Sequence, residues 1–196
     1  MSLYALKPRF QALLRPQVNR LAASGVTANQ VTLAAALGSI LLGLLLVWSG
    51  GYALLFLLVP VWLLLRMALN AVDGMLAREH AQQSRLGGYL NEMGDVVSDA
   101  ALYAPFALVA PFGPGWVGVV IVLSVISEFA GVLGSTRRYD GPMGKSDRAL
   151  VFGALGLWIA LGAPLPDVAA WLMPLLSALL AWTIVNRIRA GLAQPQ

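Results

Sequence analysis

Cysteine is absent from this sequence, and charged residues are scarce. The lack of cysteine among the 196 residues excludes disulfides and thiolate metal sites. Only 11% of the residues are charged, whereas a soluble domain averages about 25%. Residues 1–25 are too polar for a secretory signal peptide, and the sequence contains no internal repeat and no low-complexity segment. These absences argue against a soluble domain.

Apolar sequence dominates instead. Hydrophobic residues make up 59% of the chain, the mean hydropathy is +0.76, and crossing about 30 Å of hydrocarbon takes roughly 20 apolar residues. Six spans are expected, at 30–49, 52–77, 88–111, 115–135, 149–163 and 168–186. The sequence therefore predicts an all-α membrane protein with one domain over 1–196, in which an interfacial helix (1–24) precedes a six-helix bundle (30–186) and a cytoplasmic tail (187–196).

Lysine and arginine are unevenly distributed between the connecting segments. Apart from Arg66, inside the second span, they lie in the N-terminal segment, after the second and fourth spans, and in the C-terminal tail. The connections after the first, third and fifth spans have none. The positive-inside rule therefore predicts a bacterial inner (plasma) membrane protein with both termini in the cytoplasm. The net charge of +4 indicates contact with anionic membrane lipids, and no feature indicates nucleic acid.

The N-terminal segment has the pattern of a helix that lies in the headgroup layer, with basic residues between apolar ones. The apolar residues at helical spacing are Leu6, Phe10, Leu13, Leu14, Val18 and Leu21. Pro8 and Pro16 predict that this segment forms two short pieces. A polar tail with some apolar residues is the alternative.

Polar side chains form stripes on the second and third spans. On the second span, the residues within about 60° of one another are Arg66, Asn70, Asp73 and Ala77. On the third, the residues that recur every four positions are Gly87, Asn91, Asp95 and Asp99. An ionised carboxylate inside a bilayer costs roughly 2.5–3.5 kcal/mol, so several together require a cation or a water-filled cavity. Carboxylate and amide oxygens predict Mg²⁺ or Mn²⁺ rather than zinc, and a structural polar seam is the alternative.

These stripes resemble the signature of the CDP-alcohol phosphotransferases (CDP-alcohol phosphatidyltransferase class I), D-x2-D-G-x2-A-R-x8-G-x3-D-x3-D. Every interval matches, and only the first and third aspartates are replaced, by asparagine. The matching residues are Asn70, Asp73, Gly74, Ala77, Arg78, Gly87, Asn91 and Asp95. The segment "TANQVT" (27–32) is more weakly similar to the start of the family's first span.

The resemblance implies an enzyme of phospholipid biosynthesis. Such enzymes transfer a phosphatidyl group from a CDP-linked lipid, such as CDP-diacylglycerol, to a polar alcohol acceptor and release CMP. The resemblance makes Asp73 a metal ligand and Asp95 both a metal ligand and the catalytic base. The residues that it assigns to the CDP site are Gly74, Ala77, Arg78 and Gly87. Members are commonly homodimers, a state for which this sequence itself offers no signal.

Asn70 and Asn91 keep an oxygen ligand but remove two negative charges, and three explanations stay open. Asp99, with Glu92, could restore charge to a shifted metal site. Arg66 could neutralise phosphate beside a single metal ion. Alternatively, the chain could bind a CDP-lipid without turning it over. A transporter is disfavoured by the short loops and the missing second half-repeat.

The connection after the fourth span, "STRRYDGPMGKSDRAL" (135–150), is predicted to bind the acceptor because it contains four cations. "GKSDR" resembles the loops of family members whose acceptor is a phosphorylated polyol, which makes Lys145 and Arg148 the acceptor-binding candidates. The positive-inside pattern by itself explains Arg137 and Arg138.

Glu128 lies inside the fourth predicted span, where an ionised side chain requires a partner. Arg66 is one candidate for this partner. A polar contact with an adjacent loop or with a lipid headgroup is the other.

The charge distribution makes a testable prediction about topology. A reporter fused after Gln196, or inserted near Gln82 or Gly141, is expected to read as cytoplasmic, because the basic connections stay on that side of the membrane. Alkaline phosphatase and fluorescent-protein fusions measure this directly. A periplasmic signal at Gln82 or Gly141 would refute both the topology and the cytoplasmic placement of the site.

Overall fold

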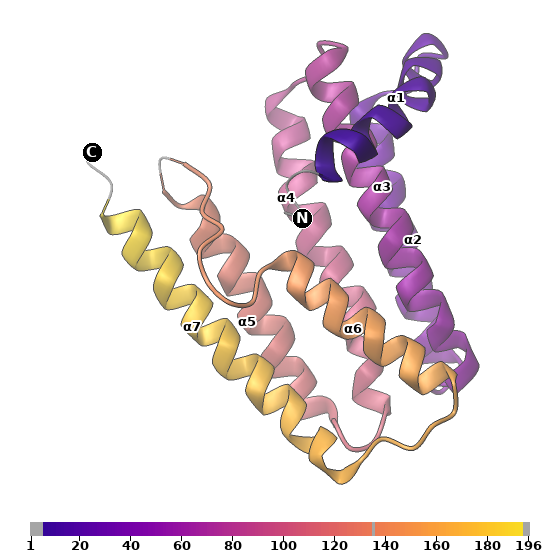
Figure 1. The fold of residues 1–196 in the computed structure, drawn as a ribbon, viewed down its shortest axis with the longest axis vertical. Helices are drawn as coiled ribbons and strands as arrows, with labels where there is room; N and C mark the ends of the chain where they lie inside the picture. Colours follow the sequence, from indigo (N-terminus) through magenta and orange to yellow (C-terminus); the bar gives the residue numbers. More distant parts are fainter. Residues whose placement is uncertain (1–5, 135, 194–196) are drawn as a thin grey trace.

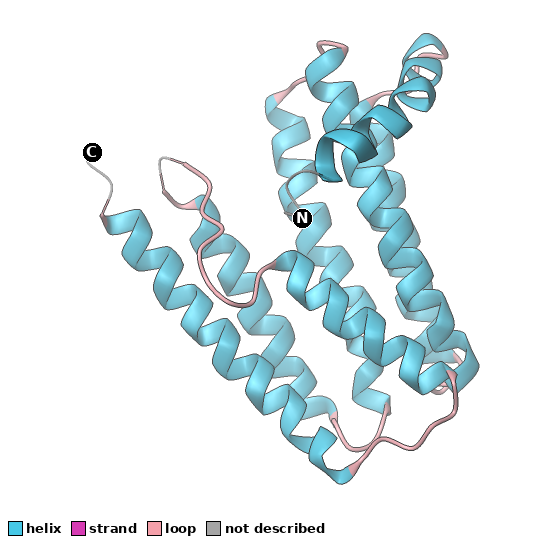
Figure 2. Ribbon diagram, in the orientation of Figure 1, coloured by secondary structure: helices cyan, strands magenta, loops and turns pink. Residues whose placement is uncertain are grey.

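The chain folds into helices joined by short connections, as a computed structural model that describes residues 6–134 and 136–193 shows. Within these residues it contains α-helices and short 3-10 helices and no strand (Figure 2). In chain order the elements are α1 (Leu6–Ala23), α2 (Ala28–Trp48), η2 (Ala53–Leu57), α3 (Leu58–Glu79), α4 (Arg85–Tyr103), η3 (Ala104–Leu108), α5 (Pro114–Val132), α6 (Lys145–Ala160), η4 (Asp167–Trp171) and α7 (Leu172–Leu192). The predicted all-α class is confirmed.

Four helical segments among the described residues are long and apolar enough to cross a membrane. These segments are Ala28–Trp48, Ala53–Glu79, Pro114–Val132 and Asp167–Leu192. The polar stripe lowers the hydropathy of α4, and α6 has only 16 residues, which at 1.5 Å per residue fall short of the hydrocarbon thickness. The count of six spans therefore stays a prediction.

The helices form two groups, and α6 lies between them (Figure 1). One group is α2, α3 and α4, and the other is the α5–α7 pair; α6 contacts α3 and η2. The α3–α4 turn, the connection from α5 to α6, the C-terminal end of α7 and α1 all lie toward one end of the bundle. The basic segments of the sequence are thereby gathered at that end.

The N-terminal segment is one continuous helix, so the prediction of two short pieces is wrong. Pro8 falls in the first turn of α1, where a backbone N–H has no helical partner in any case. Pro16 lies inside α1, which is held to the end of α3 on both sides of it. Val18 is fully buried, and the Arg15 guanidinium donates to both carboxylate oxygens of Glu79 at 3.0 and 3.1 Å.

Local capping explains where α2 and α6 begin. Thr27 and Gln30 form a reciprocal capping box at the start of α2. At the start of α6, the Gly144 N–H donates to the Asp147 carboxylate at 2.9 Å. This bond begins the helix at Lys145, so Lys145 and Arg148 lie on the first turn of α6 and not in the loop expected from the sequence.

Close contact between α2 and α4 depends on a missing side chain. A Cβ atom at Gly43 would lie 2.2 Å from the Ala101 carbonyl oxygen, so only glycine allows this approach of the two backbones. The aromatic core lies on the other side of α4, where the Tyr103 ring stacks on Phe152 with centroids 3.8 Å apart. These contacts fix α4, the helix that carries half of the signature.

Enlarging Gly43 is therefore expected to destabilise the fold. Gly43→Ala should cost about 1–3 kcal/mol by overpacking, which lowers the melting temperature by roughly 2–10 °C in a chain of this size. Thermal unfolding of the purified protein in detergent measures the change. Gly118→Ala is the matched control, because a Cβ there meets no atom within 4 Å. Equal melting temperatures for the two variants would show that the close approach of α2 and α4 at Gly43 does not contribute to stability.

Candidate functional site

Asp73 is the most enclosed carboxylate of the signature. It lies on α3, is 6% exposed, and accepts a hydrogen bond from the Thr32 hydroxyl of α2 at 2.8 Å. Thr32 closes the segment "TANQVT", and the side-chain oxygen of Asn29 lies 2.9 Å from where a Cβ of Gly87 would be. The weakly matching segment of the first span thus lies directly against both halves of the signature.

Asp95 on α4 is the meeting point of three other side chains. Arg66 of α3 donates to its Oδ1 atom at 3.1 Å and to its backbone carbonyl at 3.0 Å, and Asn70 reaches Oδ1 at 3.5 Å. Lys145 of α6 forms an ion pair with Oδ2. The Asp95 side chain is 13% exposed and that of Lys145 is 28% exposed, so both can be reached from outside.

Asp99, one turn further along α4, is bound on both oxygens by arginines. Arg66 donates to Oδ1 at 2.5 Å and Arg148 donates to Oδ2 at 3.0 Å. All three side chains are at most 5% exposed. Asp99 thus acts as the counter-ion of two buried guanidinium groups in this structure.

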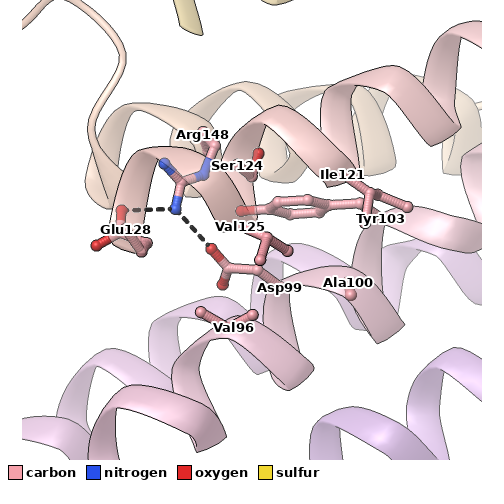
Figure 3. Close-up of a pocket in the computed structure, with 9 residues that line it drawn as sticks. All are labelled: Val96, Asp99, Ala100, Tyr103, Ile121, Ser124, Val125, Glu128 and Arg148. Atoms are coloured by element: carbon pink, nitrogen blue, oxygen red, sulfur yellow. Dashed lines mark hydrogen bonds and ion pairs between the residues drawn. The ribbon is translucent and has the colours of Figure 1, made fainter. Parts of the chain in front are cut away.

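Glu128 on α5 is the second centre of the charged network. Arg148 contacts its Oε1 at 3.0 Å, Arg187 of α7 contacts the same atom at 3.5 Å, and Arg137 contacts Oε2 at 3.3 Å. Of the two kinds of partner considered for Glu128, Arg66 is excluded because it contacts Asp95 and Asp99 of α4 instead. The contact with Arg137 of the α5–α6 connection agrees with the other, a polar contact with an adjacent loop. Helix α6 brings Arg148 between Glu128 and Asp99 instead (Figure 3).

Two arginines of this network were given no role from the sequence, Arg137, which the positive-inside pattern explained, and Arg187. Arg187 was assigned to a tail beginning at 187, but α7 runs on to Leu192, and the Arg187 side chain is 2% exposed. Its guanidinium also donates to the Ser127 carbonyl at 2.6 Å. The buried acid at Glu128 was the available signal, because it called for a nearby cation.

The residues assigned to the CDP site lie around the turn between α3 and α4. The Arg78 guanidinium lies over Gly74, where a Cβ would meet its nitrogens at 3.1 Å. Arg78 is exposed, Ala77 is half-buried and packs against the cluster around Val18, and Gly87 is half-buried. These residues therefore share the end of the bundle where Asp73 and Asp95 lie.

The donor set at the signature offers oxygen atoms only. Among the described residues, no three His, Cys, Asp or Glu side chains are grouped so as to hold a metal ion. Asp73 and Asp95 supply carboxylates, and Asn70 and Asn91, both half-buried, supply amide oxygens. This chemistry fits a hard divalent cation, with two charged ligands rather than four.

A small cavity lies beside the charged network, between α4, α5 and α6 (Figure 3). Its volume is ≈ 10 Å³, about the space that one water molecule needs. The lining residues are Val96, Asp99, Ala100, Tyr103, Ile121, Ser124, Val125, Glu128 and Arg148. The cavity is too small for an organic substrate and belongs to the buried layer beneath the site.

Comparison with protein families gives one match that covers most of the chain. The model described as CDP-alcohol phosphatidyltransferase matches residues 25–184. Among curated proteins, the inner membrane protein YnbA of Escherichia coli (strain K12) is 49% identical over 199 residues, which is 98% of this chain and 97% of that protein. An uncharacterized protein of Aquifex aeolicus (strain VF5) is 29% identical over 160 residues, covering 80% of this chain and 76% of the relative.

Solved structures share the fold. The phosphatidylinositol phosphate synthase PgsA1 of Mycobacterium tuberculosis with CDP-DAG bound superposes with a TM-score of 0.76 at 20% identity, covering 92% of this chain and 94% of that one. The same enzyme in complex with manganese and citrate gives a TM-score of 0.76 at 20% identity, covering 92% and 89%.

The environment of Asp99 makes a prediction that separates a counter-ion from a metal ligand. Asp99→Asn leaves Arg66 and Arg148 short of a charge, and breaking a buried pair costs about 3–5 kcal/mol, so the melting temperature should fall by roughly 6–20 °C. Thermal unfolding with and without Mn²⁺ measures this, and Asp140→Asn, at an exposed acid, is the control. If the difference in melting temperature between the parent protein and Asp99→Asn becomes larger when Mn²⁺ is added, Asp99 is a metal ligand instead.

Proposed function

Because the chain belongs to the CDP-alcohol phosphatidyltransferase family, we propose a specific role in the reaction for each of its charged residues at the site. The protein is a transferase of phospholipid synthesis that moves a phosphatidyl group from a CDP-linked lipid to an alcohol and releases CMP. The observation that carries the proposal is the meeting of Asp95 on α4 with Lys145 on α6, beside Asp73 on α3. Three helices thereby contribute charge to one accessible place.

Asp73 and Asp95 hold the divalent cation, Mg²⁺ or Mn²⁺, and Asn70 and Asn91 add neutral oxygen ligands. When bound, the ion neutralises charge on the pyrophosphate of the CDP-lipid. Two carboxylates in place of four support one divalent ion rather than two. The engagement of both Asp99 oxygens with arginines supports this choice over a metal site shifted toward Asp99 and Glu92.

Arg66 supplies part of the positive charge that a second metal ion, held by carboxylates at 70 and 91, would bring to the phosphate. Its guanidinium already lies on Asp95 and Asp99, one turn from Asn70. From there it orients Asp95 and adds positive charge beside the transferred phosphate, which stabilises the charge that develops on the non-bridging oxygens.

The nucleotide end of the lipid is held at the α3–α4 turn. Gly74 and Gly87 have no side chain to keep the CDP group away from the helix backbone, and Ala77 adds little bulk. Arg78 is exposed and close to Gly74, which suits it to a bidentate contact with phosphate.

The acceptor hydroxyl is activated by Asp95. Asp95 takes the hydroxyl proton as the acceptor oxygen bonds to the lipid-side phosphorus, while the bond from that phosphorus to the CMP oxygen breaks. Lys145 contacts the acceptor or the transferred phosphate, a role supported by its ion pair with Asp95. Arg148, at 1% exposure, acts as a positioning residue through Asp99 and Glu128 rather than by touching the acceptor.

The protein works in the inner membrane with its site facing the cytoplasm. The name of the Escherichia coli relative, an inner membrane protein, supports the compartment. Six membrane-crossing helices follow if α4 and α6 join the four apolar segments, and α1 then lies in the headgroup layer. A homodimer accords with the exposed apolar side chains along the spans.

A lipid-binding protein without catalysis is the competing function. The two asparagines in the signature favour it, because they remove half of the carboxylates. Metal-dependent release of CMP from CDP-diacylglycerol, measured with the purified protein over a panel of alcohols with and without Mg²⁺ or Mn²⁺, decides between the two functions.

Substitution of the two aspartates tests the assignment of residues. Asp95→Asn removes a metal ligand and the base, and CMP release should fall by at least about a hundredfold, the usual scale of general-base catalysis. Asp73→Asn should lose metal affinity and recover in part at high Mn²⁺.

Asn70→Asp is the control for charge, since the added carboxylate should be tolerated or tighten metal binding. CMP release at the parent rate by a folded Asp95→Asn protein would leave the family resemblance describing the fold alone.

A further inference from the structure

Three arginines converge on the single carboxylate of Glu128. Arg137 comes from the α5–α6 connection, Arg148 from α6 and Arg187 from α7, and their contacts to Glu128 are 3.3, 3.0 and 3.5 Å. We call these three residues the arginine cluster. Guanidinium groups gathered in this way are typical of sites that bind phosphate or carboxylate groups. Here the anion at their centre is a side chain of the protein itself.

The guanidinium groups of the arginine cluster already pair with carboxylates of the protein. Besides Glu128, Arg137 forms an ion pair with Glu92 and Arg148 forms one with Asp99. Three carboxylates, Glu92, Asp99 and Glu128, thus face the three cations, and Asp99 is also shared with Arg66. A phosphate entering the cluster would have to displace Glu128, which is 7% exposed and attached to α5.

The cluster lies beside the proposed reaction centre. Arg148 and Arg66 share Asp99, and Arg66 in turn contacts Asp95, the proposed base. Lys145, on the same helical turn as Arg148, reaches Asp95 directly. Asp95 is therefore linked to the arginine cluster through Arg66 and Asp99.

Resting on the function proposed above, we propose that Glu128 closes the arginine cluster to anionic groups, so that the acceptor is an alcohol without net negative charge. A fixed carboxylate repels a phosphate or carboxylate group and so selects against it. An uncharged polyol or a zwitterionic amino alcohol meets no such repulsion. At the outer edge, Arg137 and Glu92 are 27% and 34% exposed, and together they offer a donor and an acceptor to hydroxyl groups.

This assignment replaces the phosphorylated acceptor that the loop sequence suggested. The motif "GKSDR" gave Lys145 and Arg148 as ligands of an acceptor phosphate. In the folded chain, Arg148 is buried between Asp99 and Glu128, and Lys145 faces Asp95. Both cations thus pair with carboxylates of α4 and α5 in the folded chain.

Matched pairs of acceptors test the proposal. CMP release from CDP-diacylglycerol is measured with glycerol against glycerol phosphate and with inositol against inositol phosphate. The unphosphorylated member of each pair should give a kcat/KM at least about tenfold higher, which corresponds to about 1.4 kcal/mol. A preference for the phosphorylated members would overturn the proposal.

Glu128→Gln should then open the cluster. It removes the central charge with little change in shape, and the use of phosphorylated acceptors should rise at least about tenfold. Asp167→Asn is the matched control, because it changes the net charge equally at an exposed acid of η4, toward the opposite end of the bundle (Figure 1). If both variants use phosphorylated acceptors better than the parent protein does, the effect comes from net charge alone, and the role of Glu128 is refuted.

Titration with inorganic phosphate separates this proposal from the proposed catalysis. The titration is done without a divalent metal and with Arg78→Ala, which removes the exposed arginine of the proposed CDP site. This variant should show no rise in melting temperature with phosphate, whereas the same variant with Glu128→Gln added should be stabilised. If no alcohol yields CMP with either metal, the catalytic proposal fails, and phosphate binding still decides the role of Glu128. Should the protein with Glu128→Gln not fold, the titration of Arg78→Ala without a divalent metal decides alone, since phosphate binding by that variant contradicts a closed cluster.

Discussion

The pairing of buried arginines with carboxylates is the interaction on which the rest of this structure depends. Arg66, Arg148 and Arg187 are each at most 3% exposed, and an unpaired guanidinium at such depth would cost several kcal/mol. Asp99 and Glu128 meet this requirement and thereby tie α3, α4, α5, α6 and α7 together. Because removing any one partner leaves another charge uncompensated, the relative positions of these helices and the chemistry of the site are set by the same contacts.

This network also explains the distribution of charge at the signature. With asparagine at 70 and 91, the signature has two carboxylates, and the nearby cations pair with one of these, Asp95, and with Asp99 one turn further along α4. Arg66 binds Asp95 and Asp99, and Lys145 binds Asp95. The signature thus has fewer acidic ligands, and the cations Arg66 and Lys145 already pair with the acids nearby. Both features are the basis for proposing a single divalent ion and an acceptor without phosphate.

Most of the fold followed from the apolar pattern, and the differences have local causes. The all-helical class was predictable because apolar runs of the right length leave little choice in a membrane. The start of α6 was missed because the bond from the Gly144 N–H to Asp147 begins the helix before the apolar run does. The third span was predicted to continue to 111, but α4 ends at Tyr103 and a 3-10 helix follows. No sequence feature indicated this break, because the residues after Tyr103 are also apolar.

The sequence by itself determined the membrane class, the family signature and the two positions where asparagine replaces aspartate, because length, hydropathy and spacing are properties of the chain alone. Only the tertiary structure decided which cation meets which acid. Arg66 was one candidate partner of Glu128, but α6 inserts Arg148 between Asp99 and Glu128, and α7 brings Arg187 from 59 positions away along the chain. Ion pairing depends on distances of a few ångströms between side chains on different helices, and helix packing sets those distances.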